Sequence, residues 1–381
     1  MRILIIAMNV GRTAPGIVYE RLIHGLSKVH TIDVLTSDFN PSIELKTVNK
    51  IISIKRNAVN RRFNTLSFLT LGINLIDWFW TRKAVSHLKK QGLDNYDLVF
   101  SFVAYNNFAP LIAGDTIARS LNIKHMVYAV DALPPPIGWL EDDLFYKKLK
   151  GFISEYVSKV DGIFSANEKM LTYQLTNFKH KTNLITGVIY NPSFGDVQNY
   201  TPTHGDVNTF LYTGGIYGPR KCDYILAAFK KILIEYPNSV LEFVGSIVPE
   251  KAMAIFNLDE RKKVLISPFA NDLTSYYERS TALLDIDADL PDDIYLSSKM
   301  VNYIKINRII ITETGINSPS RGLFKDIPSI IQCNHNVDEI AGAMRKAIQL
   351  QGVANFGDRS KVIGLFDLNN IIEKINSSFG V

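Results

Sequence analysis

Short apolar runs alternate with amphipathic stretches over most of the chain. Residues 3–8 are continuously apolar and end at Asn9-Val10-Gly11, which is the pattern of a parallel strand buried on both faces. Apolar residues then recur at helical spacing over 16–29, and further strands are predicted at 31–36, 98–102, 125–130 and 162–165. Strands that alternate with helices in this way predict a doubly wound α/β sheet.

The alternation stops over 191–207, where proline, glycine and polar residues accumulate, and it restarts afterwards. The pattern predicts a Rossmann-like domain over 1–190, a linker over 191–207, a second Rossmann-like domain over 208–366 and a last helical segment over 367–381. Strands of the second domain are predicted at 209–213, 240–244, 264–267, 282–286 and 308–312.

Residues 210–229, FLYTGGIYGPRKCDYILAAF, combine an apolar strand, a glycine-rich basic turn and an amphipathic helix. Gly214 and Gly215 let the backbone turn tightly, and Arg220 and Lys221 bring two cations to the start of a helix whose N–H groups attract anions. The pattern favours a binding site for a nucleotide diphosphate. The alternative that stays open is a tight turn with a solvated basic pair.

A second segment, LSSKMVNYIKINRIIIT over 296–312, repeats this logic with a Ser-Ser-Lys entry to a short helix. Together the two segments resemble the nucleotide-binding half of retaining GT-B glycosyltransferases of the family-4 kind. The resemblance covers most of the C-terminal half and is weaker over the N-terminal half. It implies two doubly wound domains that face a central cleft, with the donor on the second domain, the acceptor on the first, and the last helix packed on the first.

The resemblance also suggests roles for the basic turn. Lys221 matches the family's motif lysine, whereas Gly215 stands where the family has an arginine, so Arg220 is expected to supply that charge from a shifted position. Both cations are interpreted as catalytic, because they would stabilise the charge that develops on the departing diphosphate.

In the second segment, Ser297 and Ser298 are expected to offer hydroxyl and N–H groups to the diphosphate, and Lys299 matches the lysine of the family's "PSK" pattern. Asn302 stands where the family has a ribose-binding glutamate, and no acidic residue stands at the paired position, Ile294. The alternatives are an ordinary helix cap at Ser297 and a solvated lysine.

Two features of the N-terminal half complete the predicted site. Gly11 and Gly16 belong to the turn after the first strand, where a donor sugar or phosphate is expected to approach the backbone, unless this is a plain strand-to-helix turn. Asp131 follows the strand at 125–130 and precedes a proline-rich loop. The resemblance implies contact of Asp131 with the transferred sugar or the acceptor hydroxyl, and a local cap is the alternative.

The alternating carboxylates Asp285, Asp287 and Asp289 also fit a metal site, because alternation along a strand puts them on one face. We favour no metal and no cofactor, since the resembling enzymes generally bind none. The histidines have neither triad nor metal spacing, so His24, His87 and His335 are expected to be surface or packing residues.

Composition narrows the class of partner. The 381 residues hold 42 basic and 37 acidic side chains, a net charge of +5 that suits anionic small ligands or an anionic membrane surface but is too small for a nucleic-acid protein. Two distant cysteines and no long apolar span predict a cytoplasmic protein with peripheral membrane contact at most. The aromatic, basic-flanked stretch 61–83 is interpreted as a core helix, with a membrane interface as the close alternative.

The sequence therefore predicts a retaining glycosyltransferase. It would move a sugar from a nucleotide-diphosphate donor to a hydroxyl of a glycan or lipid-linked glycan, in cell-surface polysaccharide synthesis at the inner face of the cell membrane. Two alternatives are a non-catalytic GT-B scaffold subunit and a nucleotide-sugar epimerase. The epimerase would need acid and base side chains, and no evident cluster of histidine and glutamate supplies them.

Overall fold

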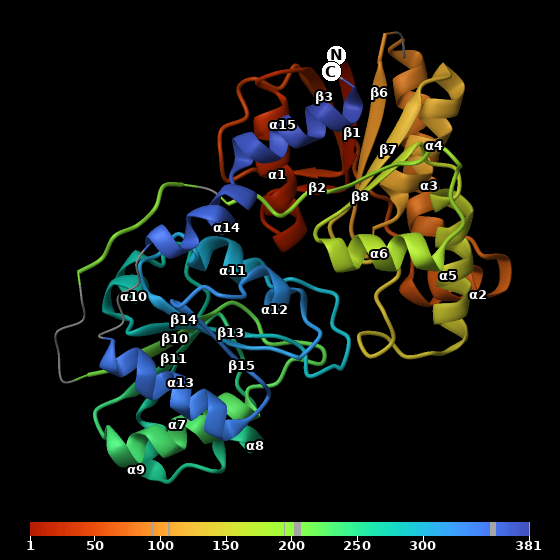
Figure 1. Ribbon diagram of the computed structural model, residues 1–381. Helices are drawn as coiled ribbons and strands as arrows, with labels where there is room; N and C mark the ends of the chain where they lie inside the picture. The colour runs from red at the N-terminus through yellow and green to blue at the C-terminus, as the bar shows by residue number, and fades with distance from the viewer. Residues whose placement is uncertain (93–94, 106, 194, 202–206, 351–355, 381) are drawn as a thin grey trace. The chain divides into compact units, whose positions relative to one another are not determined.

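A computed structural model describes residues 1–92, 95–105, 107–193, 195–201, 207–350 and 356–380 (Figure 1). Two compact units make up the chain. The first unit comprises Met1–Pro192 and Asp367–Val381, and the second comprises Ser193–Phe366. Each unit is built on a parallel sheet between layers of helices, so the predicted α/β class is confirmed for both.

In the described part of the first unit, seven parallel strands pair in the order β5-β3-β1-β6-β7-β8-β9. Ile3 in the centre pairs with Ile32 on one side and Leu98 on the other. The strands are β1 (Arg2–Ala7), β3 (Thr31–Thr36), β5 (Lys50–Ser53), β6 (Leu98–Val103), β7 (Lys124–Ala129), β8 (Gly162–Ser165) and β9 (Ile185–Val188), and β2 (Asn9–Val10) pairs separately with β4 (Asp38–Phe39).

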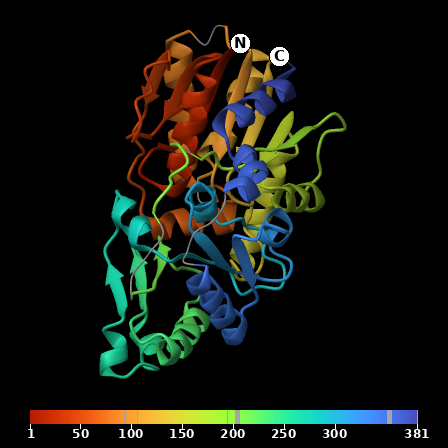
Figure 2. The ribbon, with the colours of Figure 1, turned by 60° about the vertical axis from the view of Figure 1, so that its left-hand side comes forward.

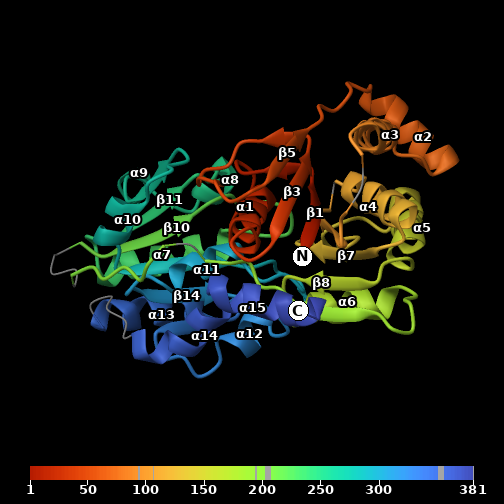
Figure 3. The same ribbon diagram turned by 90° about the horizontal axis from the view of Figure 1, so that it is seen from above.

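Helices cover both faces of this sheet (Figures 1 and 3). One face packs against α3, α4 and α5, and the other against α1 and α15. Phe379 of α15 contacts Phe100 with ring centroids 5.4 Å apart, so the last helix of the chain completes the core of the first unit. The helices are α1 (Ala14–Leu26), α2 (Arg61–Leu71), α3 (Leu75–Lys90), α4 (Ala109–Leu121), α5 (Leu144–Val157), α6 (Glu168–Asn177) and α15 (Leu368–Phe379).

The described part of the second unit contains six parallel strands in the order β12-β11-β10-β13-β14-β15. The strands are β10 (Thr209–Thr213), β11 (Val240–Val244), β12 (Val264–Ser267), β13 (Ala282–Ile286), β14 (Ile309–Glu313) and β15 (Ile330–Cys333). Phe210 and Leu284 lie in the apolar core beneath α7 and α13, two helices that run side by side in Figure 2.

The helices of the second unit follow the same alternation. They are α7 (Asp223–Glu235), α8 (Glu250–Met253), α9 (Leu258–Arg261), α10 (Thr274–Arg279), α11 (Ser298–Tyr303), α12 (Pro319–Leu323), α13 (Val337–Gln349), η1 (Phe356–Arg359) and α14 (Ser360–Leu365). The apolar side of α7 and α13 covers one face of the sheet, and α10 and α11 contact strands from the other. The side chains that alternate along β13 therefore point to different helical layers.

Of the strands in the two large sheets, β5, β9 and β15 have no counterpart in the predicted pattern. All three lie at an edge of their sheet. An edge strand is covered on fewer sides, and accordingly Lys50, Ile51 and Ser53 of β5 are exposed. The continuous apolar run that marks a central strand is absent there, which is why apolar periodicity misses these edges.

The stretch 61–83 forms α2 and the first half of α3, and its side chains divide between core and surface. Phe68 and Trp80 are buried, and Trp80 Nε1 donates to the carbonyl of Ile54 at 2.6 Å. Phe63 and Leu71, by contrast, are exposed. The core interpretation is therefore correct for one side of these helices only. Among the described residues, no helix is both long enough and apolar enough to cross a bilayer.

Candidate functional site

The glycine turn after β10 has the conformation that its sequence predicts. Gly214 has φ +92° and Gly218 has φ +63°, both in the left-handed region that favours glycine. A Cβ on Gly214 would lie 3.2 Å from Cε of Lys299, so the bare backbone lets that lysine pack against the turn. Gly215 is exposed, and a Cβ there would only touch Tyr217 at 3.5 Å.

The two cations of the turn point in different directions. Arg220 is 8% exposed, and its guanidinium lies 5.3 Å from the ring centroid of Tyr217. The Arg220 backbone pairs with Ala288, which follows β13. Lys221 is exposed to solvent. Of the predicted basic pair, therefore, only Arg220 is buried.

Two buried carboxylates, Asp285 and Asp287, face Arg220 at the carboxyl end of β13. Ser297 Oγ donates to Asp285 Oδ1 at 2.6 Å, and Ser318 Oγ donates to Asp287 Oδ2 at 2.9 Å. Within the described chain, Oδ2 of Asp285 and Oδ1 of Asp287 have no hydrogen-bond partner. Burial and the neighbouring Asp287 raise the pKa of Asp285 to about 6, and burial likewise raises the pKa of Asp287.

Lys299 completes this cluster. Its ammonium lies 4.8 Å from the ring centroid of Tyr212, and burial together with the charge of Arg220 lowers its pKa to about 8. We call Arg220, Asp285, Asp287 and Lys299 the β13 charge cluster. Two cations and two carboxylates here share a largely dry site at the strand ends, where electrostatic interactions are strong.

The remaining predicted residues of this segment separate into two groups. Ser297 is the N-cap residue of α11, but its hydroxyl bonds Asp285 and makes no cap to the helix, so the ordinary-cap alternative is wrong for its side chain. Ser298 and Asn302 are exposed. The structure thus brings Gly214, Ser297 and Lys299 to the cluster and leaves the other two facing solvent.

The three aspartates considered as a metal site, Asp285, Asp287 and Asp289, do not share one environment. Asp289 is exposed, while Asp285 and Asp287 are buried. Among the described residues, no group of three or more histidine, cysteine, aspartate or glutamate side chains is placed to hold a metal ion. Against the effect of burial, Lys299 and Arg220 lower the pKa of Asp285, and Arg220 lowers the pKa of Asp287, whereas the nearby Asp293 raises the pKa of Asp287.

A carboxylate–imidazole pair next to the cluster was not predicted. His335 Nδ1 lies 2.7 Å from Glu313 Oε1, at the end of β14, and His335 Nε2 lies 3.2 Å from the carbonyl of Ala288. Burial raises the pKa of Glu313 to about 7, and the bond to Glu313 raises the pKa of His335 against the effect of its own burial. The expectation of a surface histidine is therefore wrong for His335, whereas the packing half of the expectation is correct, because its ring centroid lies 5.9 Å from that of Tyr224. The sequence offered one signal for this pair, because Glu313 is an acidic residue at the end of the apolar strand β14.

The first unit has a pocket of about 240 Å³ at the ends of its central strands. Asp131 lines it together with Asn9, Tyr19 and Tyr105, and the backbone N–H of Tyr105 donates to Asp131 Oδ2 at 3.3 Å. Burial raises the pKa of Asp131. Asp131 thus lines a pocket within the first unit that offers one carboxylate among aromatic side chains, and its contact with a sugar or an acceptor stays a prediction.

The two glycines of the first turn are explained by packing. Gly11 has φ +82°, and a Cβ on it would lie 1.9 Å from the carbonyl oxygen of Asn40. A Cβ on Gly16 would lie 2.3 Å from the carbonyl oxygen of Gly11, whose own N–H donates to the Gly16 carbonyl at 2.9 Å. A plain strand-to-helix turn accounts for both glycines, and their contact with a donor stays a prediction.

Comparison with known proteins places the fold. No family model matches the sequence, and no curated protein does either. Among solved structures, HepE from Anabaena in complex with UDP-glucose matches with TM-score 0.68 at 12% identity, over 100% of this chain and 99% of that one. The lipopolysaccharide outer core galactosyltransferase WaaB matches with TM-score 0.67 at 13% identity, over 100% and 99%.

A putative UDP-N-acetylglucosamine 2-epimerase from Listeria monocytogenes also matches, with TM-score 0.55 at 11% identity over 100% of this chain and 95% of that one. Similarity at these identities is evidence of a shared fold, not of a shared reaction. The chain contains two α/β units, each built on a sheet of parallel strands, and it matches structures of the GT-B fold over its full length.

Proposed function

We propose that the protein is a retaining glycosyltransferase of the family-4 kind, whose second unit binds a nucleotide-diphosphate sugar and whose first unit binds the acceptor. The proposal rests on one observation: two cations, Arg220 and Lys299, lie close to each other beside the Gly214 turn, in a GT-B fold. Open α/β sheets bind ligands outside the carboxyl ends of their strands, which is where this pair lies.

In this proposal, Arg220 and Lys299 face the diphosphate. The leaving nucleoside diphosphate gains negative charge as the sugar–phosphate bond breaks, and fixed cations stabilise that charge without being consumed. Asp285 and Asp287 attract both cations electrostatically, which favours the charged forms of Arg220 and Lys299. Lys221, Ser298 and Asn302 are exposed, so we propose contacts of these residues with outer parts of the donor only.

Asp131 is proposed to contact the transferred sugar or the acceptor hydroxyl. Its pocket in the first unit is lined by Asn9 and Tyr19, which offer polar atoms beside an aromatic wall, a common composition of sugar sites. Retention is proposed to follow from front-face transfer, in which the departing diphosphate takes the proton of the acceptor hydroxyl. No side chain would then form a covalent intermediate.

The acceptor is proposed to be a glycan or lipid-linked glycan of cell-surface polysaccharide, handled at the cytoplasmic face of the membrane. The resemblance in sequence supports this setting, as does the likeness in fold to WaaB, which is named for lipopolysaccharide. Both cysteines, Cys222 and Cys333, are unpaired and buried, which fits a reducing compartment.

Turnover tests this function. The protein is incubated with UDP-, GDP-, ADP- and TDP-sugars, with and without a glycan mixture, and products are identified by mass spectrometry and NMR. The proposal expects transfer to an acceptor with retained anomeric configuration, and slow donor hydrolysis without acceptor. Conversion of the donor sugar alone would support an epimerase, and binding without any turnover would support a scaffold subunit. Either result would overturn the transferase.

A further inference from the structure

The outer helical layer of the first unit contains a pocket that the proposed transfer reaction does not use. It has a volume of about 580 Å³ and is lined by side chains of α3, α4 and α5. Its lining includes three cations, two aromatic rings and a hydroxyl: Trp78, Thr81, Arg82, Lys89, Lys90 and Tyr156. No carboxylate belongs to the lining, so the pocket is suited to an anion.

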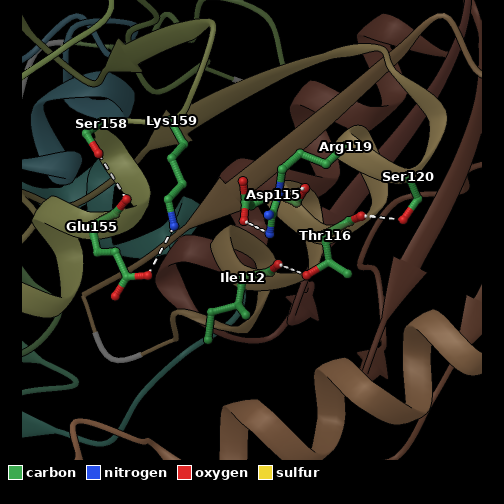
Figure 4. Close-up of polar contacts among 8 residues, drawn as sticks. All are labelled: Ile112, Asp115, Thr116, Arg119, Ser120, Glu155, Ser158 and Lys159. Atoms are coloured by element: carbon green, nitrogen blue, oxygen red, sulfur yellow. Dashed lines mark hydrogen bonds and ion pairs between the residues drawn. The ribbon is translucent and has the colours of Figure 1, made fainter.

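The acidic side chains nearest to this pocket on α4 and α5 are already neutralised (Figure 4). Asp115 pairs with Arg119 at 2.6 Å, and Glu155 pairs with Lys159 at 3.1 Å. In the described residues, no carboxylate lies within ion-pair distance of the three lining cations. Their positive charge is therefore available to a ligand.

Two further details favour a phosphate-sized polar group. Arg82 stacks over Trp78 with 4.7 Å between the guanidinium carbon and the ring centroid, which leaves the guanidinium edge open for oxygen acceptors. Thr81 is only 5% exposed, and its hydroxyl has no hydrogen-bond partner in the described residues. By contrast, Thr116 on the pocket's other side donates to the carbonyl of Ile112 at 2.9 Å, as Figure 4 shows.

Exposed apolar side chains also lie on α2 and on α3, the helix that supplies most of the pocket's lining. Phe63 and Leu71 of this region are 69% and 71% exposed, and Trp78 itself belongs to both the pocket and the exposed aromatic pair with Phe79. Residues 61–91 contain six basic side chains and one acidic side chain, and the acidic one, Asp77, is buried. Aromatic, aliphatic and cationic groups are thus exposed together on this hairpin of helices, seen at one edge of Figure 3.

We propose that this surface docks on an anionic bilayer, with the phosphate headgroup of one lipid in the pocket between α3, α4 and α5. Exposed apolar side chains of an amphipathic helix enter the interface, while lysine and arginine bind anionic headgroups. Arg82, Lys89 and Lys90 hold the phosphate, and Phe63 and Leu71 enter the acyl boundary. The docking is independent of the proposed transfer, because it requires neither donor nor acceptor.

Vesicle co-sedimentation of the full chain tests the inference, with phosphatidylcholine vesicles and with vesicles that also contain phosphatidylglycerol. The wild type is expected to bind the anionic vesicles and not the neutral ones. Lys89→Gln/Lys90→Gln should lower the partition coefficient roughly 10- to 30-fold, since each basic residue at an anionic surface contributes about a factor of five. Phe63→Ser/Leu71→Ser should lower it too, and both side chains are exposed, so folding is retained.

Lys28→Gln/Lys346→Gln is the charge-matched control, because both lysines are exposed and lie outside the pocket. This variant should bind within about twofold of the wild type. Equal loss in the control and in the pocket variant would overturn the inference, since only net charge would matter. Absence of wild-type binding to anionic vesicles would overturn it as well, and so would saturation of the pocket by inorganic phosphate without any vesicle binding.

Discussion

Ser297 Oγ donates a 2.6 Å hydrogen bond to Oδ1 of Asp285. The bond joins the residue before α11 to the end of β13, and Lys299 follows Ser297 by two residues, in the first turn of α11. It therefore fixes where the lysine ammonium sits relative to Arg220 and the Gly214 turn. A serine that would ordinarily cap its helix has its hydroxyl committed to a strand-end carboxylate instead.

Ser297→Ala is expected to destabilise the second unit by about 1–3 kcal/mol, because a buried carboxylate would lose a charge-assisted hydrogen bond. Urea unfolding followed by circular dichroism measures this change. Ser298→Ala is the matched control, since that hydroxyl is exposed, and it should change the free energy of unfolding by less than about 0.5 kcal/mol. Equal effects at the two serines would contradict the assigned bond.

Nucleotide binding should weaken as the pH rises from 7 to 9. The pKa of Lys299 is lowered to about 8, so its ammonium loses its proton in this window and with it the attraction for a diphosphate. Lys299→Arg should flatten the profile, because a guanidinium stays charged throughout, whereas Lys299→Gln should bind weakly at every pH. Calorimetric titration across the window checks this, and a wild-type affinity independent of pH would contradict it.

The Glu313–His335 pair predicts a stability that falls as pH rises from about 5 to 8. The pKa of Glu313 is raised from 4.5 to about 7 in the folded state, and that of His335 is raised from 6.5, so the folded chain binds more protons than the unfolded one. This contribution is complete below the unfolded pKa and is lost as the pH passes the folded pKa.

Glu313→Gln should remove the part of this pH dependence that the carboxyl supplies, on the order of 3 kcal/mol, since a pKa raised from 4.5 to about 7 is worth about 1.4 kcal/mol per unit. Denaturant titrations at several pH values measure the slope. Glu278→Gln removes an exposed carboxylate of the same unit and should leave the slope of the wild type. An unchanged slope in Glu313→Gln would disprove the role of the pair.

Asp131→Asn should lower the rate of sugar transfer by at least about tenfold while leaving nucleotide affinity within error, because positioned side chains commonly contribute such factors. Asp142→Asn, which replaces an exposed aspartate of the same unit, is the control. Transfer rates and nucleotide affinities measured in parallel separate the two effects. A loss of nucleotide affinity in Asp131→Asn would argue against an acceptor-side role.

The accuracy of prediction differed between the centre and the edge of each sheet. Strands such as β3 and β13 are buried on both faces, so their apolar runs locate them within a residue. β5 has three exposed residues of four, and no run marks it. β12 is also an edge strand and has exposed residues, but its apolar sequence VLIS predicts the strand with the correct bounds. A short apolar run, and not burial itself, is therefore what identifies a strand from the sequence.

The candidate site shows the same limit at the level of single residues. The glycine turn could be predicted from local sequence, because backbone conformation at Gly214 is a local property. Lys299, by contrast, is expected only from the family resemblance. The burial of Arg220 brings it near Asp287 and Asp285, which are more than 60 residues further along the chain, whereas Lys221 faces solvent. Similarly, Glu313 and His335 are 22 residues apart in the chain, and the pairing of β14 with β15, in which Glu313 lies opposite Cys333, brings them together. Pairing across elements is set by tertiary structure.

The central claim is that the β13 charge cluster binds a nucleotide diphosphate. A thermal-shift panel with UDP, GDP, ADP, TDP and CMP tests it directly on the wild type, Arg220→Ala and Lys221→Ala. One diphosphate should stabilise the wild type, by about 2.7 kcal/mol at 100 times its Kd. Arg220→Ala should abolish that shift and Lys221→Ala should keep most of it, because only Arg220 reaches the cluster. No shift with any nucleotide, or a loss confined to Lys221→Ala, would contradict the account.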